Sequence, residues 1–259
     1  MLDKIKSAEV AYITQFTEND VGHEVIRYYD DKLPDMYMHN FTFIKEGVSK
    51  ESIRNIILDE LNRRKTEKAD FLRVDCNFSI DAEIIESLPQ APDVEIYDFM
   101  YIEPKMGEHL HGNEGAIIKK AISEKVLKEG KDVDILANQS NMGTEFAHRR
   151  IERKSEIYNQ QDSGIDLFVC YDNDIPVGNC ELMLHNDIAK IEDFDILESH
   201  QRKGFGTSVL KHLLKEAHQH GVRYAYLLTD SGDSAKEMYK KCGFKKVGVK
   251  TELFFELNQ

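Results

Sequence analysis

The chain has 259 residues, which is enough for one large domain or two domains of ordinary size. Hydrophobic residues make up 41% of it and charged residues 31%, a composition typical of a soluble globular protein and not of a disordered or fibrous one. The formal net charge of −13 argues against general nucleic-acid binding, which requires a basic surface, whereas an acidic surface favours a cationic substrate or simply maintains solubility.

The cysteines and the N-terminus bear on where the protein works. The four cysteines are scattered and form no C-x-x-C pair, which is typical of reduced, buried thiols in a cytoplasmic protein. Residues 1–12 lack the apolar core of a signal peptide, and no apolar run approaches the ~20 residues of a membrane span. We therefore expect a cytoplasmic protein with neither a membrane nor a nucleic-acid partner.

The first half of the chain mixes helix-like and strand-like segments. The residue pattern predicts helices at Val21–Tyr29 and Lys50–Lys65, strands at Phe71–Ile80 and Val94–Tyr101, a loop at Lys105–Asn113 and a helix or linker at Ala116–Glu129. Gly130 then lies among charged residues. This predicts a boundary between residues 129 and 130, and thus domains 1–129 and 130–259.

The second half alternates more clearly between strand and helix patterns. Strands are predicted at Val133–Ala137, Asp166–Tyr171, Ile175–His185, Lys190–Leu197, Tyr224–Thr229, Phe244–Val249 and Glu252–Leu257. Helices are predicted at Thr144–Gln160, Lys203–His220 and Ser234–Lys241. The turn at residues 172–174 joins the second and third of these strands as an antiparallel hairpin. The expected class is α+β or mixed α/β, with helices packed on a mostly antiparallel sheet.

One strand-to-helix turn has the residue pattern of an anion-binding site. The strand that ends at Leu197 leads into Gln201-Arg-Lys-Gly204-Phe-Gly206-Thr207, and a long amphipathic helix follows. Glycines allow the backbone to approach a ligand closely, and the first turn of a helix has unpaired N–H groups that favour an anion such as phosphate. The glycines alone are equally consistent with a tight turn. The stretch matches neither the P-loop nor the Gly-x-Gly-x-x-Gly dinucleotide motif.

The segments before and after this turn indicate a function more specifically than the glycines alone. Gln201-x-x-Gly204-x-Gly206 resembles the acyl-CoA pyrophosphate motif of the GNAT (Gcn5-related N-acetyltransferase) superfamily. The strand Ile191–Ile196 resembles the strand that precedes that motif, and Ala235-x-x-x-Tyr239-x-x-x-Gly243-Phe244 resembles the late helix and its Gly-Phe turn. The match covers about half of the chain. It implies an N-acetyltransferase that uses acetyl-CoA as cosubstrate.

The resemblance also implies roles for individual residues. The backbone amides of Arg202, Lys203, Gly204, Phe205, Gly206 and Thr207 would hold the pyrophosphate. Ile196 and Leu197 would offer main-chain groups to the pantetheine arm, with a strand amide near Ile196 stabilising the thioester oxyanion. Ser234 lies at the start of the late helix as a further cofactor contact or as a cap only. Gly232 stands where the family often has Asn.

Two residues are candidates for the chemistry itself. Tyr239 would protonate the leaving thiolate, or it is a core aromatic residue of its helix. Glu192 would act as general base, because period-2 alternation places it on the same strand face as Ile196 and places Asp193 and Asp195 on the opposite face. The alternative for Glu192 is an ordinary polar residue near the site. No metal is expected, because the spacings of the histidines match no common zinc pattern.

The first half of the chain contains no CoA motif. Its segment Leu33-Pro-Asp-Met-Tyr-x-His39-Asn40-Phe41 resembles one found in two-domain members of the superfamily, whose first half is a degenerate GNAT-like fold; otherwise it is a proline turn before a buried strand. The acceptor stays open between a polyamine, an amino sugar, an antibiotic and a protein amine, and so does the oligomeric state. The rival function is an acyl-CoA-binding sensor or interaction module without turnover.

Overall fold

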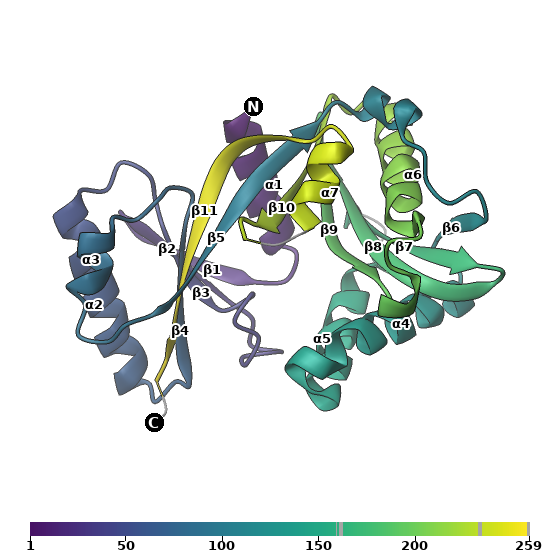
Figure 1. Ribbon diagram of the computed structural model, residues 1–259. Coiled ribbons are helices and arrows are strands. Elements are labelled where there is room, and N and C mark those ends of the chain that lie inside the picture. Colours follow the sequence, from purple (N-terminus) through teal and green to yellow (C-terminus); the bar gives the residue numbers. More distant parts are fainter. Residues whose placement is uncertain (159, 161–162, 233–234, 258–259) are drawn as a thin grey trace. The chain divides into compact units, whose positions relative to one another are not determined.

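The computed structural model describes residues 1–158, 160, 163–232 and 235–257 (Figure 1). The chain forms two compact units assembled from interleaved segments. We call them the C-terminal unit (Met1–Gln15, Met100–Leu228 and Glu237–Lys246) and the N-terminal unit (Phe16–Phe99, Thr229–Lys236 and Val247–Gln259). The expected boundary between residues 129 and 130 falls inside helix α4 (Glu124–Met142).

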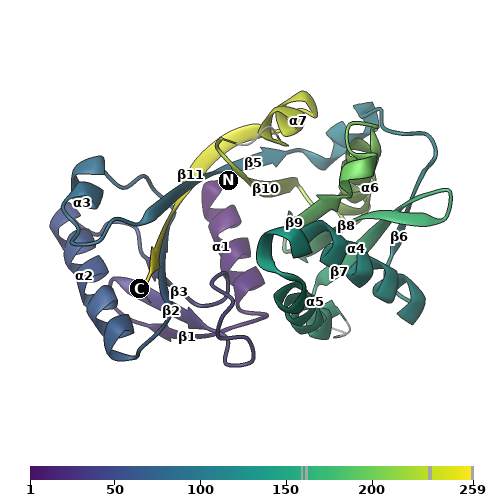
Figure 2. The ribbon, with the colours of Figure 1, turned by 60° about the horizontal axis from the view of Figure 1, so that its bottom comes forward.

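The N-terminal unit is a small sheet with helices on one face. Its strands lie in the order β1 (Glu18–Val21), β2 (Val25–Tyr29), β3 (Phe41–Ile44), β4 (Phe71–Cys76) and β11 (Lys245–Glu256). All neighbours are antiparallel except β3 and β4, which are parallel and joined by α2 (Lys50–Thr66). Figures 1 and 2 show α2 and α3 (Ala82–Glu86) beside these strands. Strand β5 (Asp93–Ile102) follows α3 in the chain.

The core of the N-terminal unit lies between α2 and this sheet. Apolar residues recur along α2 at helical spacing, with Ile53, Ile57 and Leu61 buried, and every residue of β4 is buried. The helix expected at Val21–Tyr29 is wrong, because these residues form the β1–β2 hairpin. The β-branched and aromatic residues of β2 favour a strand, and pairing with β3 on its other side outweighs any local helical pattern.

The C-terminal unit is built on a second group of neighbouring strands, which we call its sheet. Its strands lie in the order β10 (Tyr224–Asp230), β9 (Ile188–Ile196), β8 (Ile175–His185), β7 (Ile165–Asp172) and β6 (Ala116–Lys120). All neighbours are antiparallel except β9 and β10, which are parallel and joined by α6 (Phe205–Gln219). The remaining elements are α1 (Leu2–Ile13), the 3₁₀ turns at Pro104–His109 and Glu198–His200, α5 (Thr144–Tyr158) and α7 (Ala235–Lys241).

The helices cover both faces of this second sheet. A Cβ added to Gly130 of α4 would lie 2.8 Å from Leu167 of β7, whereas the neighbouring Phe168 makes an edge-to-face contact with His212 of α6. Successive residues of a strand point to opposite faces, so α4 and α6 lie on opposite faces, as Figure 2 shows. The helix predicted to be amphipathic is so, because α6 buries one apolar face that consists of Val209, Leu210, Leu213, Leu214 and Ala217.

Two predictions made between residues 116 and 137 differ from the structure. Residues 116–120, expected to be helix or linker, form the edge strand β6, and residues 133–137, expected to be a strand, lie inside α4. The side chain of Ser123 caps α4 by accepting a hydrogen bond from the N–H of Val126, and this sets the helix start. The two strands expected near the C-terminus form a single strand, β11.

The two units share one succession of elements. Three antiparallel strands lead into a crossover helix and a parallel strand in both: β1-β2-β3-α2-β4 and β7-β8-β9-α6-β10. The mixed α/β class with mostly antiparallel strand pairing is confirmed, and so is the presence of two similar halves.

Candidate active site

The turn before α6 adopts a conformation that requires glycine. Gly204 has φ = +87° and Arg202 has φ = +59°, both in the left-handed region. A Cβ at Gly204 would lie 2.9 Å from the backbone nitrogen of Asn113, which is too close for any other residue without a shift. Glycine at this position therefore serves both the turn and its packing.

The turn exposes a row of backbone donors. Within the described residues, no N–H group from Arg202 to Thr207 donates a hydrogen bond, and the first bond of the helix runs from the Ser208 N–H to the Gly204 carbonyl at 3.1 Å. Successive N–H groups in such a turn form an anion-binding concavity, and the dipole of α6 adds positive potential. The exposed side chains of Arg202 and Lys203 add positive charge.

A second segment, Gly112-Asn113, supports this turn through hydrogen bonds and close packing. The amide Nδ2 of Asn113 donates to the Lys203 carbonyl at 3.0 Å, and its backbone N–H donates to the Gly204 carbonyl at 3.2 Å. The Ser208 hydroxyl donates in return to the Asn113 carbonyl at 3.0 Å. A Cβ on Gly112 would overlap Ser208. Sequence reasoning missed these contacts, for which the only signal was Gly112-Asn113 within a segment interpreted as a loop.

Strand β9 separates from β10 ahead of the turn. The parallel pairing joins Ile188–Lys190 to Tyr224–Tyr226, and β9 continues to Ile196. The Leu197 N–H donates to Val177 of β8, so strand alternation turns the N–H of Ile196 towards the other edge of β9. The Gln201 side chain donates to the Ile196 carbonyl at 2.9 Å and links the strand end to the turn.

Helix α7 meets the strand and the turn at Gly206. A Cβ on Gly206 would lie 3.5 Å from the Phe194 ring and 3.6 Å from the Met238 sulfur. The Tyr239 ring is 6.5 Å from that of Phe194 and is 8% exposed. Tyr239 thus lies beside Phe194, whose ring is close to the turn at Gly206. Ser234 lies outside the described residues.

Helix α7 is followed by a buried cysteine. Burial raises the pKa of the Cys242 thiol despite a hydrogen bond with Thr207. A raised pKa keeps the thiol protonated and unreactive, which is consistent with a structural role.

A β-bulge changes which residues of β9 share a face. Asn179 and Glu181 of β8 pair with Asp195 and Glu192, so β9 carries one extra residue over this stretch, at Asp193 with φ = +46°. Glu192 and Asp195 therefore lie on the same face. The expectation that Glu192 shares a face with Ile196 is wrong, because period-2 alternation does not hold across a bulge.

Glu192 is held in an ion pair. Its carboxylate lies 2.8 Å from the Lys190 ammonium group, which also pairs with Glu9 of α1. The Lys190 ammonium lies 4.8 Å from the ring centre of Tyr12 and 5.5 Å from that of Tyr226. Helix α1, which the sequence did not reveal, therefore covers this face of β9.

A buried charge network continues along the same face. The Lys154 ammonium of α5 lies 2.8 Å from Glu181 and also pairs with Asp193. Arg150 lies 2.5 Å from Asp193 and 2.8 Å from Asp134. Burial lowers the pKa of Lys154, but Asp193 and Glu181 outweigh it and raise the pKa above its ordinary value. Burial raises the pKa of Glu181 although Lys154 opposes the shift.

The corresponding turn in the N-terminal unit has lost the features of an anion site. Before α2 it has a single glycine, Gly47, next to Glu46. The Ser49 side chain accepts a hydrogen bond from the N–H of Ser52, so the helix start is already capped. Lys50 also pairs with Asp81 across a cavity of about 190 Å³ at this position.

The segment at residues 33–41 of the N-terminal unit forms a compact turn. The Asn40 side chain donates to the carbonyls of Leu33 and Met36, and the His39 ring nitrogen lies 3.0 Å from the Asp30 carboxylate. Strand β3 starts at Phe41. The interpretation of this segment as a proline turn before a strand is confirmed.

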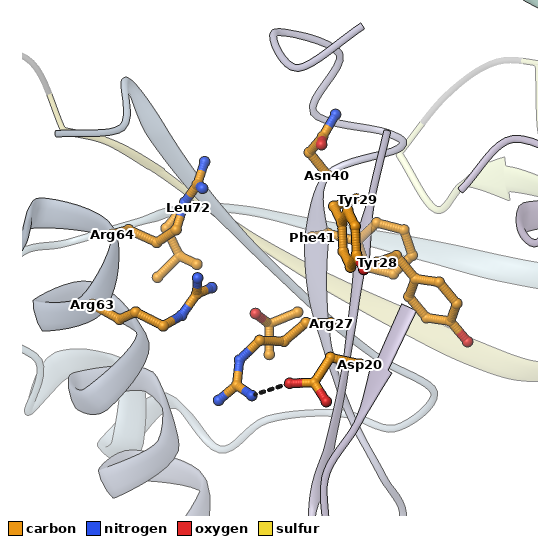
Figure 3. A pocket seen from close by; sticks show the side chains of 10 residues that line it. Asp20, Arg27, Tyr28, Tyr29, Asn40, Phe41, Arg63, Arg64 and Leu72 are labelled. Atoms are coloured by element: carbon orange, nitrogen blue, oxygen red, sulfur yellow. Dashed lines mark hydrogen bonds and ion pairs between the residues drawn. The ribbon is translucent and has the colours of Figure 1, made fainter. Parts of the chain in front are cut away.

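A cavity of about 250 Å³ lies beside the C-terminal turn of α2 (Figure 3). Three arginines line it: Arg27, Arg63 and Arg64. The buried carboxylate of Glu60 accepts from Arg27 at 2.6 Å and from Arg63 at 2.7 Å, and Asp20 accepts from Arg27 at 3.2 Å. Arg64 pairs with Glu67 at 3.4 Å, so each of the three guanidinium groups has a carboxylate partner and the cavity supports no functional assignment.

The described part of the chain has neither a metal-binding cluster nor a membrane-spanning helix. Within the described ranges, His, Cys, Asp and Glu side chains form no group of three or more that could hold a metal ion. In the same part of the chain, no helix is long and apolar enough to cross a membrane.

Comparison with known proteins agrees with this architecture. Residues 136–244 match the family model of the acetyltransferase (GNAT) family. The chain is 26% identical over 257 residues to the uncharacterized N-acetyltransferase CgeE of Bacillus subtilis (strain 168), covering 95% of each chain. A functionally unknown conserved protein from Staphylococcus epidermidis ATCC 12228 superposes with a TM-score of 0.79 at 21% identity, covering 93% of this chain and 95% of that one.

A second solved structure extends the likeness over nearly the whole chain. The GCN5-related N-acetyltransferase from Kribbella flavida superposes with a TM-score of 0.70 at 14% identity, covering 98% of this chain and 95% of that one. Residues 136–244 therefore match the acetyltransferase (GNAT) family, and the chain as a whole shares the fold of these two solved structures.

Proposed function

We propose that the protein transfers an acetyl group from acetyl-CoA to a primary amine by direct attack of the amine on the thioester. The observation that carries this proposal is the row of backbone N–H groups from Arg202 to Thr207 that donate no hydrogen bond within the described residues. Such a row at a helix N-terminus, with two cationic side chains beside it, suits a pyrophosphate.

The cosubstrate would extend from this turn along β9. Beyond Lys190, β9 has an edge outside the described pairing with β10, and the Ile196 N–H is directed towards it. The pantetheine arm would pair there like an added strand. The Ile196 N–H would then stabilise the oxyanion of the thioester, while Leu197 and the Gln201 side chain fix the end of the strand.

The proposed chemistry needs a base and an acid. The amine nitrogen bonds to the acetyl carbon, the carbon–sulfur bond breaks, and the thiolate takes a proton from the Tyr239 phenol. A carboxylate of β9 takes the proton that the ammonium form must lose. Glu192, the base expected from the sequence, is paired with Lys190, and Asp195 is the other β9 carboxylate on that face.

The rival function is acyl-CoA binding without turnover, and a thiol-release assay separates the two. Wild-type protein is incubated with acetyl-CoA and a panel containing propylamine, putrescine, spermidine, glucosamine, an aminoglycoside and a lysine peptide. Our proposal predicts CoA release above background with at least one amine. Micromolar acetyl-CoA binding without release for any amine would favour the sensor.

Replacing Tyr239 with Phe tests the proposed acid. The variant keeps the buried ring and its contact with Phe194, so we expect unchanged acetyl-CoA affinity and a kcat about 10- to 100-fold lower. Steady-state kinetics together with calorimetric titration of acetyl-CoA provide the check. A kcat within twofold of wild type would leave Tyr239 as a core aromatic residue only.

A further inference from the structure

Asn179 of β8 has a buried side chain with unused hydrogen-bonding capacity. The residue is 1% exposed, and neither its Nδ2 nor its Oδ1 has a hydrogen-bond partner within the described residues. Buried polar side chains are nearly always hydrogen-bonded, so an unpaired carboxamide requires a functional explanation. Its place in the sheet, directly across from Asp195 of β9, suggests one.

Asp195 is a carboxylate that forms no ion pair with any described residue. Directly opposed residues in antiparallel strands share a face, so Asp195 lies on the face of Asn179 and of α4. Asn138 of α4 donates to it at 3.0 Å. Arg150, the nearby cation from α5, pairs with Asp134 and Asp193 instead, and no ion pair of Asp195 is found in the described part of the chain.

The groups around Asp195 shift its titration towards neutral pH. Burial and the carboxylates of Asp193 and Asp134 raise the pKa of Asp195, while Asn138 and Arg150 oppose the shift, and the result is about 6. A general base is most effective when its pKa is close to the working pH. In contrast, Glu192 forms an ion pair with Lys190. Burial lowers the pKa of the Lys190 ammonium group, but the carboxylates beside it, Glu192 first, outweigh burial and raise that pKa.

We propose that Asp195 and Asn179 form the acceptor subsite, which takes the ammonium group of a small cationic alkylamine, with Asp195 as the general base. This inference rests on the proposed function. Asp195 directly precedes Ile196, whose N–H we assign to the oxyanion, and it lies on the opposite strand face from Phe194 and Tyr239. The acceptor therefore approaches from the α4 side, and the donor lies on the α6 side.

The acceptor nitrogen loses two protons during the transfer. Asp195 takes one proton from the ammonium group and later releases it to solvent. The neutral nitrogen bonds to the acetyl carbon and the carbon–sulfur bond breaks. The nitrogen then loses its second proton to solvent, and the Tyr239 phenol, which gave its proton to the sulfur, regains one from solvent. The Asn179 carboxamide meanwhile holds a polar group of the acceptor.

The decisive variant is Asp195→Asn, assayed by thiol release at pH 7 with two kinds of nucleophile. Propylamine, putrescine and spermidine are protonated at this pH and need a base, whereas hydroxylamine is largely neutral and does not. We expect at least a 100-fold loss of kcat/KM with the alkylamines and less than a threefold loss with hydroxylamine, at unchanged acetyl-CoA affinity. Asp166→Asn, on β7 and paired with Lys120, is the matched control and should match wild type.

A pH profile gives a second readout that a merely structural role would not change. With propylamine, the kcat/KM of wild type should fall on the acid side with a midpoint near the pKa of Asp195, about 6, and the Asn variant should lack this limb. The folded pKa lies above the unfolded one, so ionisation of Asp195 opposes folding as pH rises through this range. Asp195→Asn should therefore raise Tm at pH 8 but not at pH 4.

Asn179→Ala tests the second side chain. We expect the KM for putrescine and spermidine to rise at least tenfold with kcat within threefold of wild type. An unchanged KM would remove Asn179 from the subsite.

The remaining outcomes separate this inference from the proposed function. Absent acetyl-CoA binding, or absent turnover of every amine including hydroxylamine by wild type, would overturn the proposed function itself. Wild-type turnover of hydroxylamine with none of the three alkylamines would overturn the cationic acceptor. Equal losses with alkylamines and hydroxylamine in Asp195→Asn, or no loss with either, would overturn the base assignment.

Discussion

Gly204→Glu is expected to abolish acetyl-CoA binding. The added side chain would displace the turn from the Asn113 backbone and place a negative charge beside the N–H groups of residues 202–207, so it would disrupt these donors and repel the pyrophosphate. Hydrogen bonds to a charged group contribute roughly 1.5–3 kcal/mol each. Losing even two of them and adding repulsion predicts an affinity at least about 100-fold lower, or about 2.8 kcal/mol. Calorimetric titration of acetyl-CoA provides the measurement.

Two control variants separate charge from geometry. Gly204→Ala adds only the Cβ near the Asn113 backbone at a positive φ, so it should lower stability by about 1–2 kcal/mol and retain measurable binding. Gly47→Glu places the same charge at the corresponding turn of the N-terminal unit, at φ = +83° with no atom within 4 Å of its Cβ, and should leave affinity unchanged. Tight binding by Gly204→Glu would contradict the site assignment.

Lys154→Ala is expected to destabilise the fold strongly. The Lys154 side chain is 3% exposed and lies between Glu181 and Asp193, and its removal leaves two buried carboxylates with less compensation. Breaking a buried pair in this way costs about 3–5 kcal/mol, a large share of the usual stability of a protein. Urea unfolding at pH 7 measures the change in unfolding free energy.

The pH dependence of this variant has a definite sign. Without Lys154 the pKa of Glu181 rises further above its ordinary value of 4.5, so the folded state retains a proton that the unfolded chain releases. The destabilisation should therefore be larger at pH 8 than at pH 5. Lys125→Ala removes an 83% exposed lysine paired with Glu129 and should change stability by less than about 0.5 kcal/mol. A similarly small effect of Lys154→Ala would contradict the account of the network.

Local patterns in the sequence predicted much of the C-terminal unit. The β7–β8 hairpin, the amphipathic helix α6 and the glycine turn before it all follow from residues close together in the chain. The predictions failed where pairing between distant segments decides the structure. The hairpin at residues 18–29 is stabilised by β3, and residues 116–120 form a strand because β7 pairs with them.

The sequence was sufficient to predict the anion-binding turn of the candidate site, but not the arrangement of the site's carboxylates. The turn at residues 201–206 is contiguous, so its motif could be recognised directly. The face occupied by Glu192 depends on a single extra residue at Asp193, and nothing in the local composition marks that bulge. Glu9 and Tyr12 come from a helix more than 160 residues away, so their contacts with Lys190 and Glu181 required the structure.

An NMR titration of the ¹⁵N-labelled protein with acetyl-CoA tests directly whether the turn before α6 and the end of β9 bind the cosubstrate. We expect the backbone amide resonances of Arg202–Thr207 and Ile196 to shift most, and those of the N-terminal unit's turn at residues 45–49 to stay unchanged. Saturable shifts centred elsewhere, or no shift at millimolar acetyl-CoA, would contradict it.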